Sequence, residues 1–193
     1  ADVGIYREDG AEPKLFLTEK SDLRELPEKE ADGNKGTFGK ILAVAGSSGM
    51  CGAAFLSASG VFATGAGMVK IVTPEENRIP LQTMLPEAII SCTGDWEKDF
   101  EWCDVLVIGP GIGMTVKAAD KVEFFLKKAK QEKKQVVLDA DGLNLLAENP
   151  KWKNYLGRHV ILTPHMGEMS RLTGKSIREL KSDRAGAARA LAA

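Results

Sequence analysis

At Val105-Leu106-Val107-Ile108-Gly109-Pro110-Gly111-Ile112-Gly113, an apolar run typical of a buried strand leads directly into a loop that contains three glycines. Three further loops follow short apolar runs in the same way: Gly46–Gly52 after Ile41–Ala45, Asp139–Asn144 after Val136–Leu138, and Thr163–Glu168 after Val160–Leu162. In an open parallel sheet, the loops that leave the carboxyl ends of the strands share one edge, and ligands bind there. The four loops together therefore predict a site for a large, phosphorylated ligand.

Helical patterns alternate with these runs. In Val116–Lys130, apolar residues recur at steps of three and four and form one stripe against lysine-rich faces. Further helices are predicted at Gly52–Thr64, Gly142–Glu148, Gly167–Thr173 and Ser182–Ala193, and further strands at Met68–Val72 and Ala88–Cys92. This alternation predicts an α/β fold, in which a mostly parallel sheet is covered by helices on both faces.

Composition narrows the classes of protein. The formal net charge of −1 over 193 residues argues against a nucleic-acid binder. The three cysteines are odd in number and lack C-x-x-C spacing, which argues against a disulfide framework or a zinc cluster. The sequence has no apolar run near the roughly 20 residues that span a bilayer, and no secretory signal pattern at its start. These features predict a cytoplasmic chain without a membrane partner.

The first residues differ from the rest. Residues 1–34 are charged and turn-rich, with few side chains that could fill a core, and predict a linker or a surface-hugging arm with one short helix near Thr18. Residues 35–193 carry the strand and helix patterns and are predicted to form the folded domain.

Two glycine-rich loops are candidates for ligand binding. Gly46, Gly49 and Gly52 lie where a loop enters a helix, a position that offers free N–H groups and a positive dipole end to an anion. This loop is neither a Walker loop nor G-x-G-x-x-G, and the alternative is a tight structural turn. In the loop Gly109–Gly113, the glycines let the chain pass beneath a ligand. We expect Gly111→Val to abolish function while leaving folding largely intact.

Polar side chains follow the other two strands. Asp139 and Asp141 could hold Mg²⁺ through water or accept protons from ribose hydroxyls, although Asp141 could instead cap the next helix. Asp139, nearer the sheet, is the better functional candidate. His165 is one of only two histidines, and a hydrogen bond to substrate is its favoured role. A metal pair with Glu168 would provide only two ligands, so no protein metal site is predicted.

Seven motifs in this order resemble the ADP-dependent NAD(P)H-hydrate dehydratase family, a branch of the ribokinase-like superfamily. The motifs are Lys35–Lys40, Ala45–Ala54, Gly65-Ala66-Gly67, Leu85-Pro86-Glu87, Ile108–Gly113, Leu138–Leu146 and Leu162–Glu168. The start of the chain, from Ala1 to Glu19, is similar to the junction that precedes the dehydratase in bifunctional members, which also carry an epimerase domain.

The resemblance implies a ribokinase-like fold and a repair activity. The family phosphorylates the ring hydroxyl of hydrated NADH or NADPH at the expense of ADP or ATP, with Mg²⁺, and then eliminates phosphate. By resemblance, Ala53, Gly111 or Gly113, and His165 would contact the hydrated dinucleotide. Asp139, Asp141 and Asn144 would line the edge between substrate and nucleotide. The resemblance and the small residues of Gly52–Thr64 suggest a homo-oligomer.

The chain departs from the family pattern after Gly174. The Lys-Gly segment that grips the nucleotide and the Gly-Asp motif that supplies the catalytic base have no counterpart up to Ala193. The expectation is a fold that is incomplete at the C-terminus, poorly soluble and without useful turnover, its base lying beyond Ala193. Two alternatives stay open: another ribokinase-like small-molecule kinase, and a non-catalytic dinucleotide-binding fragment.

Overall fold

The computed structural model describes Lys20 and residues 32–193, and the chain divides between Gly33 and Asn34 into two compact units. The helix expected near Thr18, the junction-like start and most of the expected arm lie outside the described residues. The second unit, Asn34–Ala193, contains the sheet and the helices described for this protein. Among the described residues, no helix is both long and apolar enough to cross a membrane.

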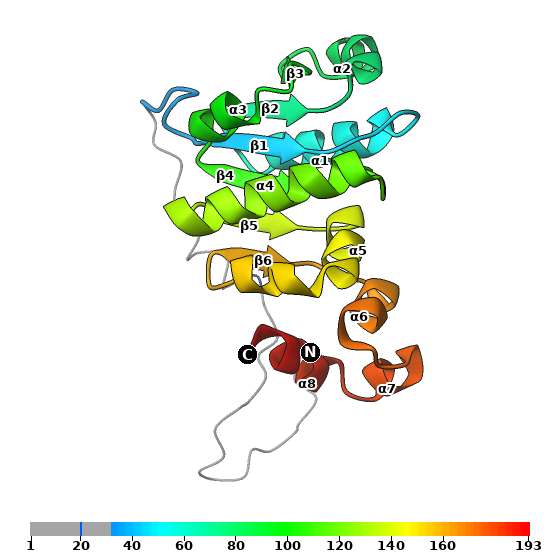
Figure 1. Ribbon diagram of the computed structural model, residues 1–193. Helices are drawn as coiled ribbons and strands as arrows, with labels where there is room; N and C mark the ends of the chain where they lie inside the picture. Colours follow the sequence, from blue (N-terminus) through cyan, green and yellow to red (C-terminus); the bar gives the residue numbers. More distant parts are fainter. Residues whose placement is uncertain (1–19, 21–31) are drawn as a thin grey trace. The chain divides into compact units, whose positions relative to one another are not determined.

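A sheet of six parallel strands forms the centre of this unit (Figure 1). Its spatial order is β3-β2-β1-β4-β5-β6, with each neighbouring pair parallel. The strand order reverses direction between β1 and β4, which makes the ends of these two strands the point where open α/β sheets bind ligands. The strands are β1 Lys40–Val44, β2 Met68–Val72, β3 Ile89–Ser91, β4 Val105–Ile108, β5 Gln135–Leu138 and β6 Val160–Leu162.

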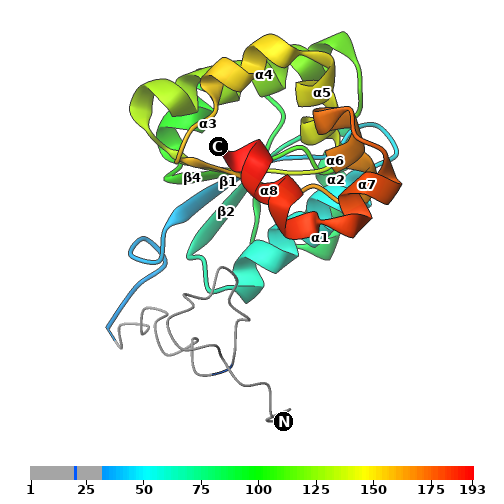
Figure 2. The same cartoon turned by 90° about the horizontal axis from the view of Figure 1, so that it is seen from below.

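The predicted parallel sheet with helices on both faces is confirmed. α3, α4 and α5 cover one face of the sheet, while α1 lies on the other (Figure 2). The α-helices are α1 Cys51–Ala63, α2 Arg78–Met84, α3 Trp96–Trp102, α4 Val116–Glu132, α5 Asp141–Glu148, α6 Met166–Thr173, α7 Ile177–Ser182 and α8 Arg184–Ala192. The 3₁₀ segments are η2 Glu75–Asn77 and η3 Pro150–Tyr155.

The helix predicted at Ser182–Ala193 was wrong in its start. Ser182 is the last residue of α7, and α8 begins at Arg184, because Asp183, with φ −149° and ψ 78°, interrupts the helical backbone. Asp183 accepts a hydrogen bond from the Gly186 N–H at 2.7 Å and so caps α8. The helices α2, α3 and α7 were not predicted.

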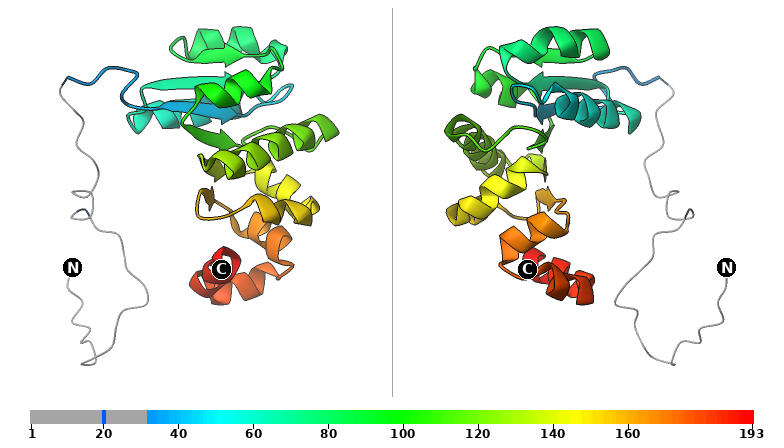
Figure 3. Two further views of the ribbon diagram at one scale, coloured as in Figure 1. Left: turned by 60° about the vertical axis from the view of Figure 1, so that its left-hand side comes forward. Right: turned by 90° about the vertical axis from the view of Figure 1, so that its right-hand side faces the viewer.

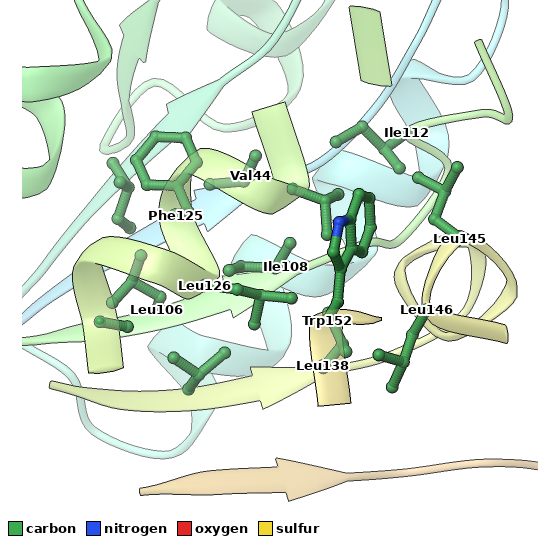
Figure 4. Packing of buried hydrophobic residues seen from close by; sticks show 14 of the residues in the cluster. Val44, Leu106, Ile108, Ile112, Phe125, Leu126, Leu138, Leu145, Leu146 and Trp152 are labelled. Carbon is green, nitrogen blue, oxygen red and sulfur yellow. The ribbon is translucent and has the colours of Figure 1, made fainter. Parts of the chain in front are cut away.

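Alternation of side chains along the strands divides the core in two. Leu42, Val44, Leu106, Ile108 and Leu138 point to one face, where they are fully buried. Figure 4 shows several of these residues against Phe125, Leu126 and Trp152. On the opposite face the strands contribute small or β-branched residues, which are Ala43, Ala45, Val69 and Ile71, and α1 packs on them through Ala54 and Ala58.

The C-terminal helices form a third, smaller cluster beside the β6 edge of the sheet (Figure 3). Met169, Leu180 and Ala187 bury against one another there. Between this cluster and β6 lies an apolar groove of about 960 Å³. Ile161 lines the groove and is 59% exposed, in contrast to the fully buried Leu138 on β5.

Candidate functional site

All four predicted loops leave the carboxyl ends of strands in the same parallel sheet, so they lie along one edge. Gly46–Gly52, the β1 loop, leads into α1, and Gly109–Gly113, the β4 loop, precedes α4. Asp139–Asn144, the β5 turn, leads into α5, and Thr163–Glu168, the β6 loop, leads into α6. Because β1 and β4 are the strands at which the order reverses, the two glycine-rich loops occupy the centre of this edge.

The β4 loop and the β5 turn meet through their backbones. A Cβ added at Gly109, whose φ is 121°, would overlap the carbonyl oxygen of Asp139 and stand 2.7 Å from the Gly142 nitrogen. Gly142 is also constrained, though less severely, because its Cβ would stand 2.7 Å from Leu138 Cδ1 and 3.0 Å from the Ile108 oxygen. Glycine at both positions is therefore what lets the two loops touch.

The β1 and β4 loops also meet. The Gly46 N–H donates to the Pro110 carbonyl at 2.8 Å. A Cβ at Gly111 would stand 2.6 Å from the Cβ of Ala53, and one at Gly113 would lie 3.7 Å from Ser47 Oγ. The structure thus brings together Ala53, Gly111 and Gly113, three of the residues expected to contact the substrate.

This contact corrects the expectation for Gly111→Val. Gly111 has a φ of 63°, and a side chain there would press on Ala53 and Met50. The substitution would therefore disturb the packing of α1 as well as ligand space, and its loss of function would not report on binding alone.

A buried amide supports the β1 loop from below. Asn77 is 3% exposed, and its Nδ2 donates to the Ser47 carbonyl at 3.1 Å and to Thr73 Oγ1 at 2.8 Å. A Cβ at Gly46 would collide with Thr73 Oγ1, so this glycine also serves close packing. By contrast, Gly49 has a positive φ and open space around it, and Gly52 is the second residue of α1 with open space.

The start of α1 can receive an anion. Met50 precedes the helix without a side-chain cap, and the first turn carries no acidic residue. Uncapped N–H groups and the positive end of the helix dipole favour negative charge at such a position. This geometry supports the anion-binding role expected for the β1 loop.

Asp141 does not cap its own helix. It is the first residue of α5, and its Oδ2 accepts a hydrogen bond from the Gly113 N–H at 2.9 Å. Its Oδ1 accepts from Asn144 Nδ2 at 3.4 Å. The capping alternative is thus wrong: the carboxylate joins the β5 turn to the β4 loop.

Asp139 is held by the neighbouring loop. Thr163 Oγ1 donates to Asp139 Oδ1 at 2.8 Å. Between the two aspartates, Ala140 adopts φ 49° and ψ −122°, a conformation that L side chains rarely adopt. The Gly142 N–H donates to the Asp139 carbonyl at 3.0 Å, so the turn is of type II′, in which glycine usually holds this position. Such a conformation costs about 1–3 kcal/mol and is found preferentially at functional sites.

His165 caps α6 with its ring. Its Nδ1 accepts from the N–H groups of Gly167 at 2.9 Å and Glu168 at 3.3 Å. The proton of the neutral ring therefore sits on Nε2, which is 3.2 Å from Glu168 Oε1. Glu168 is buried, and its Oε2 accepts from the His165 N–H at 2.8 Å. The ring is 67% exposed at the edge of the sheet, so it remains open to a ligand.

The described residues contain no group of three or more His, Cys, Asp or Glu side chains placed to hold a metal ion. His165 and Glu168 remain a pair, which forms the capping box of α6. Thr163, Asn77 and Ala140 were not singled out individually from the sequence. Each acts through contacts with distant segments or through its backbone conformation, and a single sequence carries no local signal for either.

A parallel sheet whose loops gather where the strand order reverses defines an open α/β protein with a candidate ligand site at that edge, and comparison with known proteins gives its class. A ribokinase-like superfamily protein from Enterococcus faecalis V583 superposes with a TM-score of 0.78 over 93% of this chain and 65% of its own, at 23% identity. That likeness establishes the ribokinase-like fold.

The family model described as NAD(P)H-hydrate dehydratase matches residues 41–193, and this chain belongs to that family. It is 37% identical over 171 residues to the bifunctional NAD(P)H-hydrate repair enzyme of Escherichia coli (strain K12), covering 86% of this chain and 31% of that protein. The ADP/ATP-dependent NAD(P)H-hydrate dehydratase from Bacillus subtilis, co-crystallised with ATP/Mg²⁺, is 36% identical, with a TM-score of 0.69 over 83% of this chain and 56% of its own. The chain thus spans about a third of the bifunctional relatives.

Proposed function

We propose that residues 35–193 carry the substrate-binding edge of an enzyme that repairs hydrated NADH or NADPH by nucleotide-dependent dehydration. The observation that carries the proposal is the meeting of Ala53, Gly111 and Gly113 at the point where the strand order reverses. Family membership and the names of the relatives from Escherichia coli and Bacillus subtilis support the choice of substrate.

The chemistry suits loops of backbone amides. Hydroxide is a poor leaving group, and phosphorylation of the ring hydroxyl replaces it with phosphate, a good one. Phosphoryl transfer depends mainly on positioning and on stabilising charge, which backbone N–H groups and helix ends provide without titrating. Close approach of the backbone to the substrate is what the glycines of the β1 and β4 loops permit.

Each predicted residue then has a distinct task. Gly46, Gly49 and Gly52, with the uncapped start of α1, receive a phosphate of the dinucleotide. Ala53 and Gly111, which pack closely against each other, place the backbone of the β4 loop beside the substrate. Asp139, oriented by Thr163, accepts hydrogen bonds from the substrate or from water on the metal.

His165 and Asn144 complete the proposed site. The Nε2–H is the donor of the neutral His165 ring, because Nδ1 accepts the hydrogen bonds of the helix cap, and we propose that the substrate shares this donor with Glu168 Oε1, which lies 3.2 Å away. Asn144 donates a hydrogen bond to Asp141, and we place it at the edge of the sheet between substrate and nucleotide. We propose ADP or ATP as the phosphoryl donor, with Mg²⁺ bound mainly through the nucleotide phosphates, in line with the ATP/Mg²⁺ complex of the Bacillus subtilis relative.

We also propose a homo-oligomer in the cytoplasm. The outward side of α1 carries Gly52 and Gly60 with open space around them and the 70% exposed Leu56, a surface on which a second copy could pack. All three cysteines are unpaired, as is usual in a reducing compartment. Sedimentation equilibrium tests the oligomer: a monomer at all concentrations overturns it.

The activity is tested by supplying the native gene product with hydrated NADH, ADP and Mg²⁺ and following the absorbance of restored NADH. We expect the native product to restore NADH and Asp139→Asn to lower kcat/KM roughly 10- to 100-fold, the loss of a hydrogen bond to a charged group. Phosphorylation of a vitamin-precursor alcohol with hydrated NADH untouched would favour the small-molecule kinase. Binding without turnover by the native product would favour the non-catalytic fragment.

A further inference from the structure

A chain of side-chain hydrogen bonds runs from α6 to the β4 loop. Arg171 Nη1 donates to Asn144 Oδ1 at 2.9 Å. Asn144 Nδ2 donates to Asp141 Oδ1 at 3.4 Å, and Asp141 Oδ2 accepts from the Gly113 N–H at 2.9 Å. This hydrogen-bond network joins residues that are up to 58 positions apart in sequence, from Gly113 to Arg171.

The far end of this hydrogen-bond network reaches Gly113, a residue of the β4 loop that makes few other contacts. Within the β4 loop, the Ile112 N–H donates to Gly109 and the Pro110 carbonyl accepts from Gly46, both near the start. Gly113 has a φ of 80° and only ordinary contacts around a Cβ, and the next residue, Met114, is 43% exposed. The hydrogen bond from the Gly113 N–H to Asp141 therefore restrains the short segment between the buried Ile112 and the start of α4.

The other end of this hydrogen-bond network is the charged and exposed side chain of Arg171. Arg171 is exposed in the last turn of α6, where a cation is favoured by the helix dipole. With Asn144, Met114, Ala147 and Glu148, it lines a shallow hollow of about 500 Å³ beside the β4 loop. A guanidinium holds the Asn144 carbonyl in one orientation, and this turns the Asn144 amide toward Asp141.

We propose that Arg171 is a positioning residue, which acts through Asn144 and Asp141 to hold the Gly113 end of the β4 loop in its ligand-binding conformation. The proposal rests on the proposed function for its effect on substrate. Its structural part, the restraint on Gly113, stands on the hydrogen bonds alone.

The test compares Arg171→Met and Arg171→Lys with Arg178→Met, a matched control at an exposed arginine of α7. Amide hydrogen exchange at Gly113 is measured in each protein, together with the melting temperature and the dissociation constant for NADPH. We expect Arg171→Met to speed exchange at Gly113 and to weaken NADPH binding roughly three- to tenfold, the worth of one hydrogen bond, with the melting temperature unchanged. Arg171→Lys should restore most of both effects, and Arg178→Met should cause neither.

The outcomes separate the two proposals. Unchanged exchange at Gly113 in Arg171→Met overturns the positioning role, whatever NADPH does. Faster exchange in Arg171→Met, in a protein whose wild type binds no NADPH, supports the positioning role and overturns the proposed function. A fall in melting temperature that matches the loss of binding, with no rescue by lysine, would make Arg171 a structural residue and contradict the proposal.

Discussion

The two sides of β5 are built in opposite ways. Toward β4, the chain passes so closely that Gly109 leaves no room for a Cβ and Gly142 leaves little, and Ile108 and Leu138 are fully buried. Toward β6, an apolar groove of about 960 Å³ separates the sheet from the C-terminal helices, and Ile161 is 59% exposed. Backbone contacts on the closely packed side of β5 specify the β4 loop and the β5 turn, while on the β6 side the candidate site depends on side-chain hydrogen bonds of Thr163 and His165.

The largest effect should come from Gly109→Ala. Its new Cβ would overlap the Asp139 backbone, and no flexible side chain is there to move, so we expect a loss of more than about 3 kcal/mol in the free energy of unfolding. Gly113→Ala is the matched control: its φ is also positive, but its Cβ would have room, and we expect about 1–2 kcal/mol. Urea denaturation measures both. Equal losses would show that the junction is looser than its geometry implies.

The second prediction contrasts two aliphatic residues on neighbouring strands. Leu138→Ala should lower the free energy of unfolding by about 2–5 kcal/mol, because it leaves a cavity in the main core. Ile161→Ala should change it by no more than about 0.5 kcal/mol, because its side chain is mostly exposed. Urea denaturation measures both changes as shifts in the midpoint, provided that the dependence of the free energy of unfolding on urea concentration stays the same. A large loss of stability in Ile161→Ala would mean that the groove is covered in solution.

A smaller change in the free energy of unfolding should come from a lysine that is buried on α4. Lys121 on α4 is 8% exposed, and its pKa is lowered by burial and then by the nearby Lys117. Since its folded pKa lies below its unfolded pKa, the charged form opposes folding at neutral pH, and this penalty fades as the pH rises through the folded pKa. Lys121→Met should therefore stabilise the protein at pH 7, with a gain that shrinks at alkaline pH. A gain that does not change with pH would assign the effect to packing.

The burial of Cys103 gives the smallest prediction. Burial raises the pKa of this thiol to about 11, and the side chain is 2% exposed. We expect no alkylation of Cys103 in the native protein at pH 8, and full alkylation once urea unfolds it. Mass spectrometry of labelled peptides follows the reaction. Rapid native labelling would show that α3 opens readily over the core.

Most of the sheet could be predicted from the sequence because each strand is a short apolar run that ends in a turn signal. Val105–Ile108 and Val160–Leu162 occur as predicted, and parallel pairing then placed the four loops on one edge. The helices that escaped prediction have weak local patterns: α2 contains Pro80 near its start, and α3 is short and largely charged.

The chemistry of the edge was less predictable. The types of residue at Asp139, Asp141 and His165 pointed to function, but their hydrogen-bond partners lie far away in sequence or depend on the local backbone. The unusual conformation of Ala140 left no trace in composition, since alanine gives no sign of a positive φ. Long-range contacts and backbone strain are settled only when the chain folds.

The proposed function depends most directly on the four loops forming one dinucleotide site. Isotopically labelled chain should be titrated with NADPH, a stable relative of the hydrated substrate, while NMR follows the glycine amides. We predict that Gly46, Gly111 and Gly113 shift together with a single dissociation constant, whereas Gly157 near the β6 groove and Gly174 at the end of α6 do not shift. Amide signals of Gly46, Gly111 and Gly113 that do not shift, or shifts confined to the residues around the β6 groove, would contradict a dinucleotide site formed by the four loops.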